Sequence, residues 1–208
     1  MTPRWQNRPA TLGSGLAAAA LGLFGWTVLL PPAPGKKLVG VAYPHTSNWD
    51  LLPALLWTWA TRTPLKFVAK HSLFKFPLGP LLRAWGGVPV NRRRAGDNFV
   101  TAVAALIAQQ PEIVLGLAPE GTRERNEAWK SGFYHMAQAA GVPIALIVFD
   151  WKRKRVGVLA YLTPSGDLAA DYEQIRAVYS GVQGRHPQKA TPIRPAEIEV
   201  AAESPQEG

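Results

Sequence analysis

Cysteine is absent from the 208 residues of the chain. This absence excludes a disulfide scaffold, a thiol nucleophile and a metal site built from cysteine thiolates. Disorder of the whole chain is also excluded, because 47% of the residues are hydrophobic and only 18% are charged, which leaves enough apolar side chain to bury a core. A chain of this length is expected to form one domain with a full core.

Acidic residues are scarce in the first half of the chain. Residues 1–104 contain 12 Lys and Arg but only two acidic residues, Asp50 and Asp97, and six of the eight Trp also lie there. Cations mixed with indole rings favour an interface with anionic lipid headgroups, because Lys and Arg meet the surface potential and Trp prefers the apolar boundary. Nucleic acid is the competing partner of a basic protein. No nucleic-acid-binding motif occurs, so we predict a membrane surface and no nucleic acid.

The longest stretch without charge covers residues 9–35. Within it, residues 12–30 are long enough to cross about 30 Å of hydrocarbon as a helix, but they are rich in Ala and Gly and therefore only moderately apolar. The exit at 31–34 (PPAP) lacks the Ala-x-Ala site of a cleaved signal peptide. We expect a membrane-associating helix embedded in or lying against one leaflet, with a spanning helix, a core helix and a signal peptide as alternatives.

The rest of the chain alternates between apolar runs typical of buried strands and amphipathic runs typical of helices. Strands are expected at 38–43, 65–69, 86–91, 112–118, 142–148 and 156–163, and helices at 51–60, 97–109, 131–140 and 169–180. This order predicts an α/β fold with a mixed, mostly parallel sheet flanked by helices in a single domain. We expect a membrane-associating segment at 1–35, this domain at 36–185, and a flexible, Pro-rich tail at 186–208.

His45 and Asp50 lie between the first of these strands and the helix that follows it. Side chains at such a junction project into the crevice beyond the carboxyl ends of the strands. A carboxylate bonded to one imidazole nitrogen fixes the tautomer and leaves the other nitrogen free to accept a proton, which makes a general base. The alternative is structural: Asp50 caps the helix, and one of its oxygens then remains available to the imidazole.

Two other chemistries are weaker for this region. A metal site would need more ligands, but the remaining histidines are scattered and no His-Glu-x-x-His occurs. Ser47 lies beside the pair and could serve a hydrolase, although the chain has no Gly-x-Ser-x-Gly sequence.

A second candidate site is the turn Pro119-Glu120-Gly121-Thr122-Arg123, which follows a central strand. Backbone N–H groups of a Gly-containing turn bind anions, and a guanidinium matches the geometry of phosphate. The alternative is an ordinary turn with an exposed Glu-Arg pair. Arg92, which follows another short strand, is a further candidate anion ligand, with a solvated basic run as its alternative.

In order and spacing, these segments resemble the glycerolipid acyltransferases of the lysophosphatidic acid acyltransferase type. The resemblance covers about residues 36–165 and rests on four segments: His45-x4-Asp50, GVPVNR at 87–92, PEGTR at 119–123 and VPIAL at 142–146. In that family the first segment is catalytic and the second ends in an acceptor-binding Arg. Pro44 departs from the pattern, since Asn is usual before the His, and Asn91 stands where Asp is common.

The resemblance implies acyl transfer from a thioester, acyl-CoA or acyl carrier protein, to the hydroxyl of a lysophospholipid, with 1-acylglycerol 3-phosphate as the expected acceptor. His45 would be the base and Asp50 its orienter. The acceptor phosphate would be held by Arg123 and Arg92 with the amides near Gly121 and Thr122. No metal or bound cofactor is implied.

Two further roles and two alternatives follow from the same resemblance. Glu120 would orient Arg123 or the acceptor, and Lys70 could reach the phosphate, with a structural lysine as the alternative. A different acceptor, such as a lyso-aminolipid, remains open, and so does a non-catalytic protein that binds lipid headgroups. The expected location is the cytoplasmic face of the inner or plasma membrane.

Overall fold

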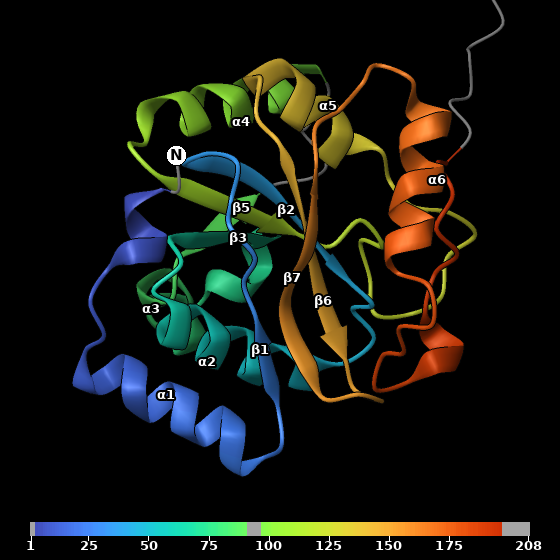
Figure 1. Cartoon of the computed structure of the whole chain (residues 1–208). Helices are drawn as coiled ribbons and strands as arrows, with labels where there is room; N and C mark the ends of the chain where they lie inside the picture. Colours follow the sequence, from blue (N-terminus) through green and yellow to red (C-terminus); the bar gives the residue numbers. More distant parts are fainter. Residues whose placement is uncertain (1–2, 91–96, 197–208) are drawn as a thin grey trace, which may run out of the picture.

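A single seven-stranded sheet with helices on both faces forms the centre of the molecule (Figure 1). The computed structural model describes residues 3–90 and 97–196. Its strands are β1 (Thr27–Leu29), β2 (Lys37–Tyr43), β3 (Leu65–Lys70), β4 (Gly87–Val90), β5 (Ile113–Leu117), β6 (Ile144–Asp150) and β7 (Arg155–Leu162). Its α-helices are α1 (Leu12–Leu23), α2 (Leu51–Thr61), α3 (Leu78–Ala84), α4 (Asp97–Gln109), α5 (Gly132–Ala140) and α6 (Leu168–Val178).

The strands follow the order β1-β7-β6-β2-β5-β3-β4. From β6 to β4 they are parallel, whereas β7 pairs with β6 in antiparallel fashion and β1 runs parallel to β7. The predicted α/β class and the mostly parallel sheet are therefore confirmed. The carboxyl ends of β6, β2, β5, β3 and β4 meet at one edge, and the loops that leave these strands lie there together.

Two hydrophobic cores cover the two faces of the sheet. Alternation along the strands sorts the side chains, because successive residues of a strand point to opposite faces. Along β6, Ile144, Leu146 and Val148 belong to the core beneath α4, α5 and α6, whereas Ala145 and Ile147 belong to the core beneath α1 and α2. Both faces of the central strands are buried, which explains why these strands are continuous apolar runs.

The N-terminal apolar run is shorter as a helix than predicted. Thr11 and Ser14 form a capping box at the start of α1. At its end Gly25 adopts φ 73° and the N–H of Trp26 donates to the carbonyl of Leu21 at 2.8 Å, a glycine stop that favours a turn over a further helical residue. The next residues form β1, an edge strand, so the expectation of one helix over 12–30 is wrong.

The same segment is packed into the domain. Trp5 and Leu21 are buried in the core beneath α1 and α2, so residues 3–35 are continuous with the domain that follows. No helix in the described part of the chain combines the length and the apolar character needed to cross a membrane.

The C-terminal segment returns across the loops at the carboxyl edge of the sheet. Trp129 and Arg194 are joined through the backbone at 2.9 Å, and Thr191 is fully buried. This corrects the prediction of a flexible tail for residues 186–196, because backbone hydrogen bonds tie this Pro-rich stretch to the domain. Residues 197–208 lie outside the described part.

Candidate active site

The loop that leaves β2 carries the predicted His-Asp pair. After Tyr43 the chain enters a short 3-10 helix, Asn48–Asp50, which leads into α2. Ser47 caps this turn: its Oγ accepts the N–H of Trp49 at 3.2 Å, while Oδ2 of Asp50 accepts the N–H of Ser47 at 3.0 Å. The reciprocal cap explains why the local sequence folds into a tight turn that points Asp50 inward.

Asp50 and His45 approach each other within this turn. Oδ2 of Asp50 lies 3.2 Å from Nδ1 of His45, within ion-pair distance, and Nδ1 has no partner in hydrogen-bond geometry among the residues described. The carboxylate is 0% exposed and the imidazole 22% exposed. A buried carboxylate beside Nδ1 favours the tautomer that carries its proton there, so Nε2 is left to accept a proton from a substrate.

The second oxygen of Asp50 has a partner that the sequence analysis did not foresee. Nε1 of Trp151 donates to Oδ1 at 2.7 Å. The sequence-based alternatives had assigned one oxygen to capping and the other to the imidazole. In the structure, Oδ2 accepts the capping N–H of Ser47 and also lies beside Nδ1 of His45, while the indole N–H donates to Oδ1. The only sequence signal for this contact is that Trp151 directly follows a strand whose carboxyl end lies at the same edge.

Glu120 supports the same loop from β5. Its Oε2 accepts the backbone N–H of His45 at 2.5 Å and its Oε1 accepts the backbone N–H of Thr191 at 2.9 Å. Burial raises the pKa of Glu120 above its ordinary value, against the opposing effect of these two hydrogen bonds. Both oxygens are therefore engaged by backbone, whereas the sequence analysis had placed Glu120 against Arg123 or the acceptor.

The last two residues of the 119–123 turn face outward. Gly121 has φ 70°, a conformation that favours glycine, and Oγ1 of Thr122 accepts the N–H of Glu124 at 3.3 Å. Thr122 and Arg123 are exposed, and Arg123 forms no ion pair with any residue that the structure describes. A guanidinium in this position is available to an anionic ligand.

The other predicted anion ligands lie on the strands beyond β5. Lys70 is the last residue of β3, so its backbone lies at the same edge of the sheet as that of His45 and Glu120. Arg92 follows β4, which ends at Val90 at this edge, but Arg92 itself lies outside the described residues. Within the described ranges, no three His, Asp or Glu side chains are grouped closely enough to hold a metal ion.

The chain is similar to known acyltransferases over most of this region. Residues 33–150 match the family model described as Acyltransferase. Over 151 residues, 69% of this chain and 60% of the relative, it is 31% identical to the 1-acyl-sn-glycerol-3-phosphate acyltransferase of Salmonella typhimurium. It is 30% identical to a protein of the same name from Borreliella burgdorferi, over 53% of this chain and 45% of that protein. The chain thus spans 60% or less of these relatives.

The fold is also similar to a solved structure. The crystal structure of the 1-acyl-sn-glycerophosphate acyltransferase PlsC from Thermotoga maritima superimposes with a TM-score of 0.52, over 81% of this chain and 74% of that one. At 18% identity, this comparison demonstrates a shared fold.

Proposed function

The chain belongs to the acyltransferase family, and we propose that it transfers a fatty acyl group from a thioester to the hydroxyl of a lysophospholipid, with 1-acylglycerol 3-phosphate as acceptor. The observation that carries this proposal is the contact between the buried carboxylate of Asp50 and Nδ1 of a half-buried His45. It lies at the edge of the sheet where the exposed Arg123 also lies. The relatives of the same family that act on this acceptor support the choice of substrate.

His45 acts as the general base of the proposed reaction. Its Nε2 accepts the proton of the acceptor hydroxyl as that oxygen attacks the thioester carbonyl. The new ester C–O bond forms, the C–S bond breaks, and the thiolate of CoA or of acyl carrier protein leaves. Asp50 stabilises the imidazolium that forms in the transition state. The attack is direct, and Ser47 is not a nucleophile because it is buried and its Oγ caps the turn.

The phosphate of the acceptor provides the positioning energy. Arg123 carries a planar guanidinium that matches a phosphate group, and it has no ion-pair partner in the described part of the chain. We assign it the main contact and place Arg92 and Lys70 as further cations; the N–H of Gly121 is not assigned to the phosphate, because it donates to the carbonyl of Ala118 at 3.1 Å. Holding the phosphate fixes the hydroxyl near His45, which converts a bimolecular step into a local one.

Docking to a membrane surface brings the lipid substrates to this site. Large apolar side chains are exposed on α1, α2, α3 and their flanking turns, with Leu12 83% and Phe76 89% exposed. These helices are drawn in the lower part of Figure 1, where α1 packs against α2. The basic half of the chain carries these exposed apolar side chains, and this combination fits contact with an anionic leaflet from one side. We place this surface at the cytoplasmic face of the inner or plasma membrane.

Mass spectrometry of products tests the proposal. The purified chain is incubated with vesicles that contain several lysophospholipids and a lyso-aminolipid, with acyl-CoA or acyl carrier protein as donor. We expect phosphatidic acid as the main product, and a loss of about 10²–10⁴-fold in His45→Ala, the range of general-base catalysis. His135→Ala, an exposed histidine on α5, is the matched control and should remain active.

Each other result contradicts a defined part of the proposal. Full turnover by His45→Ala shows that His45 is not the general base. Acylation of the lyso-aminolipid alone changes the acceptor. Binding of lysolipid without product from either donor indicates a non-catalytic headgroup-binding protein.

A further inference from the structure

Asp50 is a buried carboxylate whose other hydrogen-bond donors are neutral. The backbone N–H of Ser47 and the indole N–H of Trp151 donate to it, and among the side chains that the structure describes, the imidazole of His45 is the basic group within ion-pair distance of it. An indole N–H donates but cannot accept. It therefore fixes Oδ1 without cancelling the negative charge and without competing for the proton on the imidazole.

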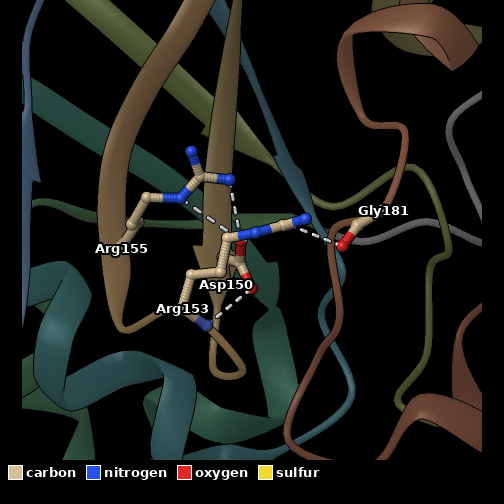
Figure 2. Close-up of polar contacts among 4 residues, drawn as sticks. All are labelled: Asp150, Arg153, Arg155 and Gly181. Atoms are coloured by element: carbon tan, nitrogen blue, oxygen red, sulfur yellow. Dashed lines mark hydrogen bonds and ion pairs between the residues drawn. The ribbon is translucent and has the colours of Figure 1, made fainter.

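A neighbouring carboxylate shows the opposite arrangement. Asp150, the last residue of β6, is also 0% exposed, but its Oδ2 accepts from Nη2 of Arg155 at 2.8 Å and from Nη1 of Arg153 at 3.2 Å (Figure 2). Two guanidinium groups neutralise this charge. These two buried aspartates thus differ in role: Asp150 is a structural anchor, whereas the charge of Asp50 is left for His45.

The anchor fixes the turn that carries Trp151. Arg153 is bonded both to Asp150 and to the carbonyl of Gly181 at 2.6 Å, which ties the turn between β6 and β7 to the segment after α6 (Figure 2). The backbone N–H of Trp151 donates to the carbonyl of Gln183 at 2.9 Å on the same segment. The turn that carries the indole is therefore fixed both through the side chain of Arg153 and through the backbone of Trp151.

The indole ring itself is packed among an aromatic ring and two cations. Trp26 meets it edge to face with centroids 5.0 Å apart, and the guanidinium of Arg185 and the ammonium of Lys154 lie 4.8 Å and 5.1 Å from its centroid. Such contacts restrict the rotation of the ring. Its N–H is therefore aimed at Oδ1 before any substrate binds.

We propose that Trp151 is a positioning residue for the proposed acyl transfer, which holds Asp50 through Oδ1 so that Oδ2 orients the imidazole of His45. The inference rests on the proposed function of this pair, since it assigns a supporting residue to the same site. Loss of the indole N–H leaves Oδ1 without its donor, so the carboxylate rotates about its Cβ–Cγ bond and no longer selects one tautomer of His45. Fewer molecules then present a bare Nε2 to the hydroxyl.

Trp151→Phe tests the inference by kinetics. With vesicles containing 1-oleoylglycerol 3-phosphate and with oleoyl-CoA, we expect kcat to fall roughly 10- to 100-fold, as for loss of a hydrogen bond to a charged group, while the KM of the acceptor changes less than about twofold. In an Asp50→Asn background, the same substitution should cause less than about a twofold further loss, because residues that act through one another are not additive. Trp57→Phe is the matched control, because it removes an indole N–H that donates to the carbonyl of Leu29 and not to Asp50, so it should leave the tautomer of His45 unchanged.

The tautomer of His45 gives a readout that does not depend on turnover. Two-bond proton–nitrogen NMR spectra of the imidazole should show the Nδ1–H tautomer in the wild type and an increased share of the Nε2–H tautomer in Trp151→Phe. If Phe does not fold, 3-benzothienylalanine at position 151 keeps the shape of the indole and replaces its N–H by sulfur. If the wild-type protein shows no turnover but Trp151→Phe still changes the tautomer of His45, the proposed function is contradicted and the positioning role is supported.

Two results overturn the inference. The first is a kcat of Trp151→Phe, or of the benzothienyl variant, within twofold of the wild type, together with an unchanged tautomer. The second is an equal loss of kcat in the presence and absence of the Asp50 carboxylate, which indicates a general structural effect.

Discussion

Replacing Glu120 by Gln tests whether this residue supports the loop that carries His45 or binds the proposed acceptor. The side chains of Glu and Gln have nearly the same shape, but the amide has one accepting oxygen where the carboxylate has two. In the wild type the two oxygens accept the backbone N–H groups of His45 and Thr191. In Glu120→Gln the NH2 group faces one of these N–H groups, so a donor meets a donor and one buried N–H loses its partner.

The size of the effect follows from that lost partner. A buried donor without an acceptor costs about 1–3 kcal/mol, which for a chain of this size lowers Tm by roughly 2–4 °C per kcal/mol, or about 2–12 °C altogether. The backbone at His45 also loses its anchor. Since small displacements of a catalytic group lower rates steeply, we expect kcat to fall on the order of 10- to 100-fold.

Thermal unfolding and steady-state kinetics on the same preparation measure both quantities. Glu124→Gln is the matched control, because Glu124 lies in the same loop, is exposed and forms an ion pair with Lys189 at the surface. This substitution should change stability by less than about 0.5 kcal/mol. Our reasoning is refuted if Glu120→Gln keeps the wild-type Tm and kcat and instead raises the KM of the acceptor, which is the signature of a substrate-binding carboxylate.

Other predictions concern the loops that flank the site. Burial alone would raise the pKa of Asp150, but hydrogen bonds from Arg155 and Arg153 outweigh it and lower the pKa below 3.8. The wild type therefore gains stability from this carboxylate above pH 3.8. It loses that stability as the pH falls through the lowered pKa of Asp150 in the folded protein. Asp150→Asn should unfold about 1–3 kcal/mol more easily at neutral pH, and denaturant titrations should show the difference shrinking toward pH 2; a difference that stays constant with pH contradicts the assignment. Gly184→Ala places a Cβ 2.6 Å from Oγ1 of Thr46, and we expect a loss of about 1–3 kcal/mol together with lower kcat, whereas an unchanged melting curve would show that the two segments separate freely.

Periodicity in the sequence was sufficient to predict the central part of the fold. The helix expected at 51–60 is observed at Leu51–Thr61, and the strand expected at 65–69 is observed at Leu65–Lys70. Such elements could be predicted because each buries a continuous apolar face, which fixes the residue pattern. β1 could not be predicted, because three residues at the end of an Ala- and Gly-rich run are too few to show a period, and their pairing with β7 depends on the far end of the chain.

The site was predictable only where its residues are local. His45 and Asp50 are five positions apart and their contact follows from one turn, so residue types and spacing indicate it. The indole that completes Asp50 comes from 101 positions away, and the segment that completes Glu120 from 71 positions away. No local sequence pattern around Trp151 or Thr191 indicates these contacts. The Pro-rich composition after residue 186 even favoured a flexible tail, because composition does not reveal hydrogen bonds to another loop.

The hydrogen bond between Glu120 and Thr191 has a consequence for the biosynthesis of the protein. A chain grows from its N-terminus and its segments emerge in order, so His45 and Asp50 leave the ribosome long before Thr191 does. Until residue 191 has emerged, one oxygen of Glu120 lacks the backbone donor that it has in the finished fold. The turn that carries His45 and Asp50 is made early, but the hydrogen bond from Thr191 to Glu120 forms only near the end of synthesis. A nascent chain that stops before residue 191 therefore carries the motif without its final geometry.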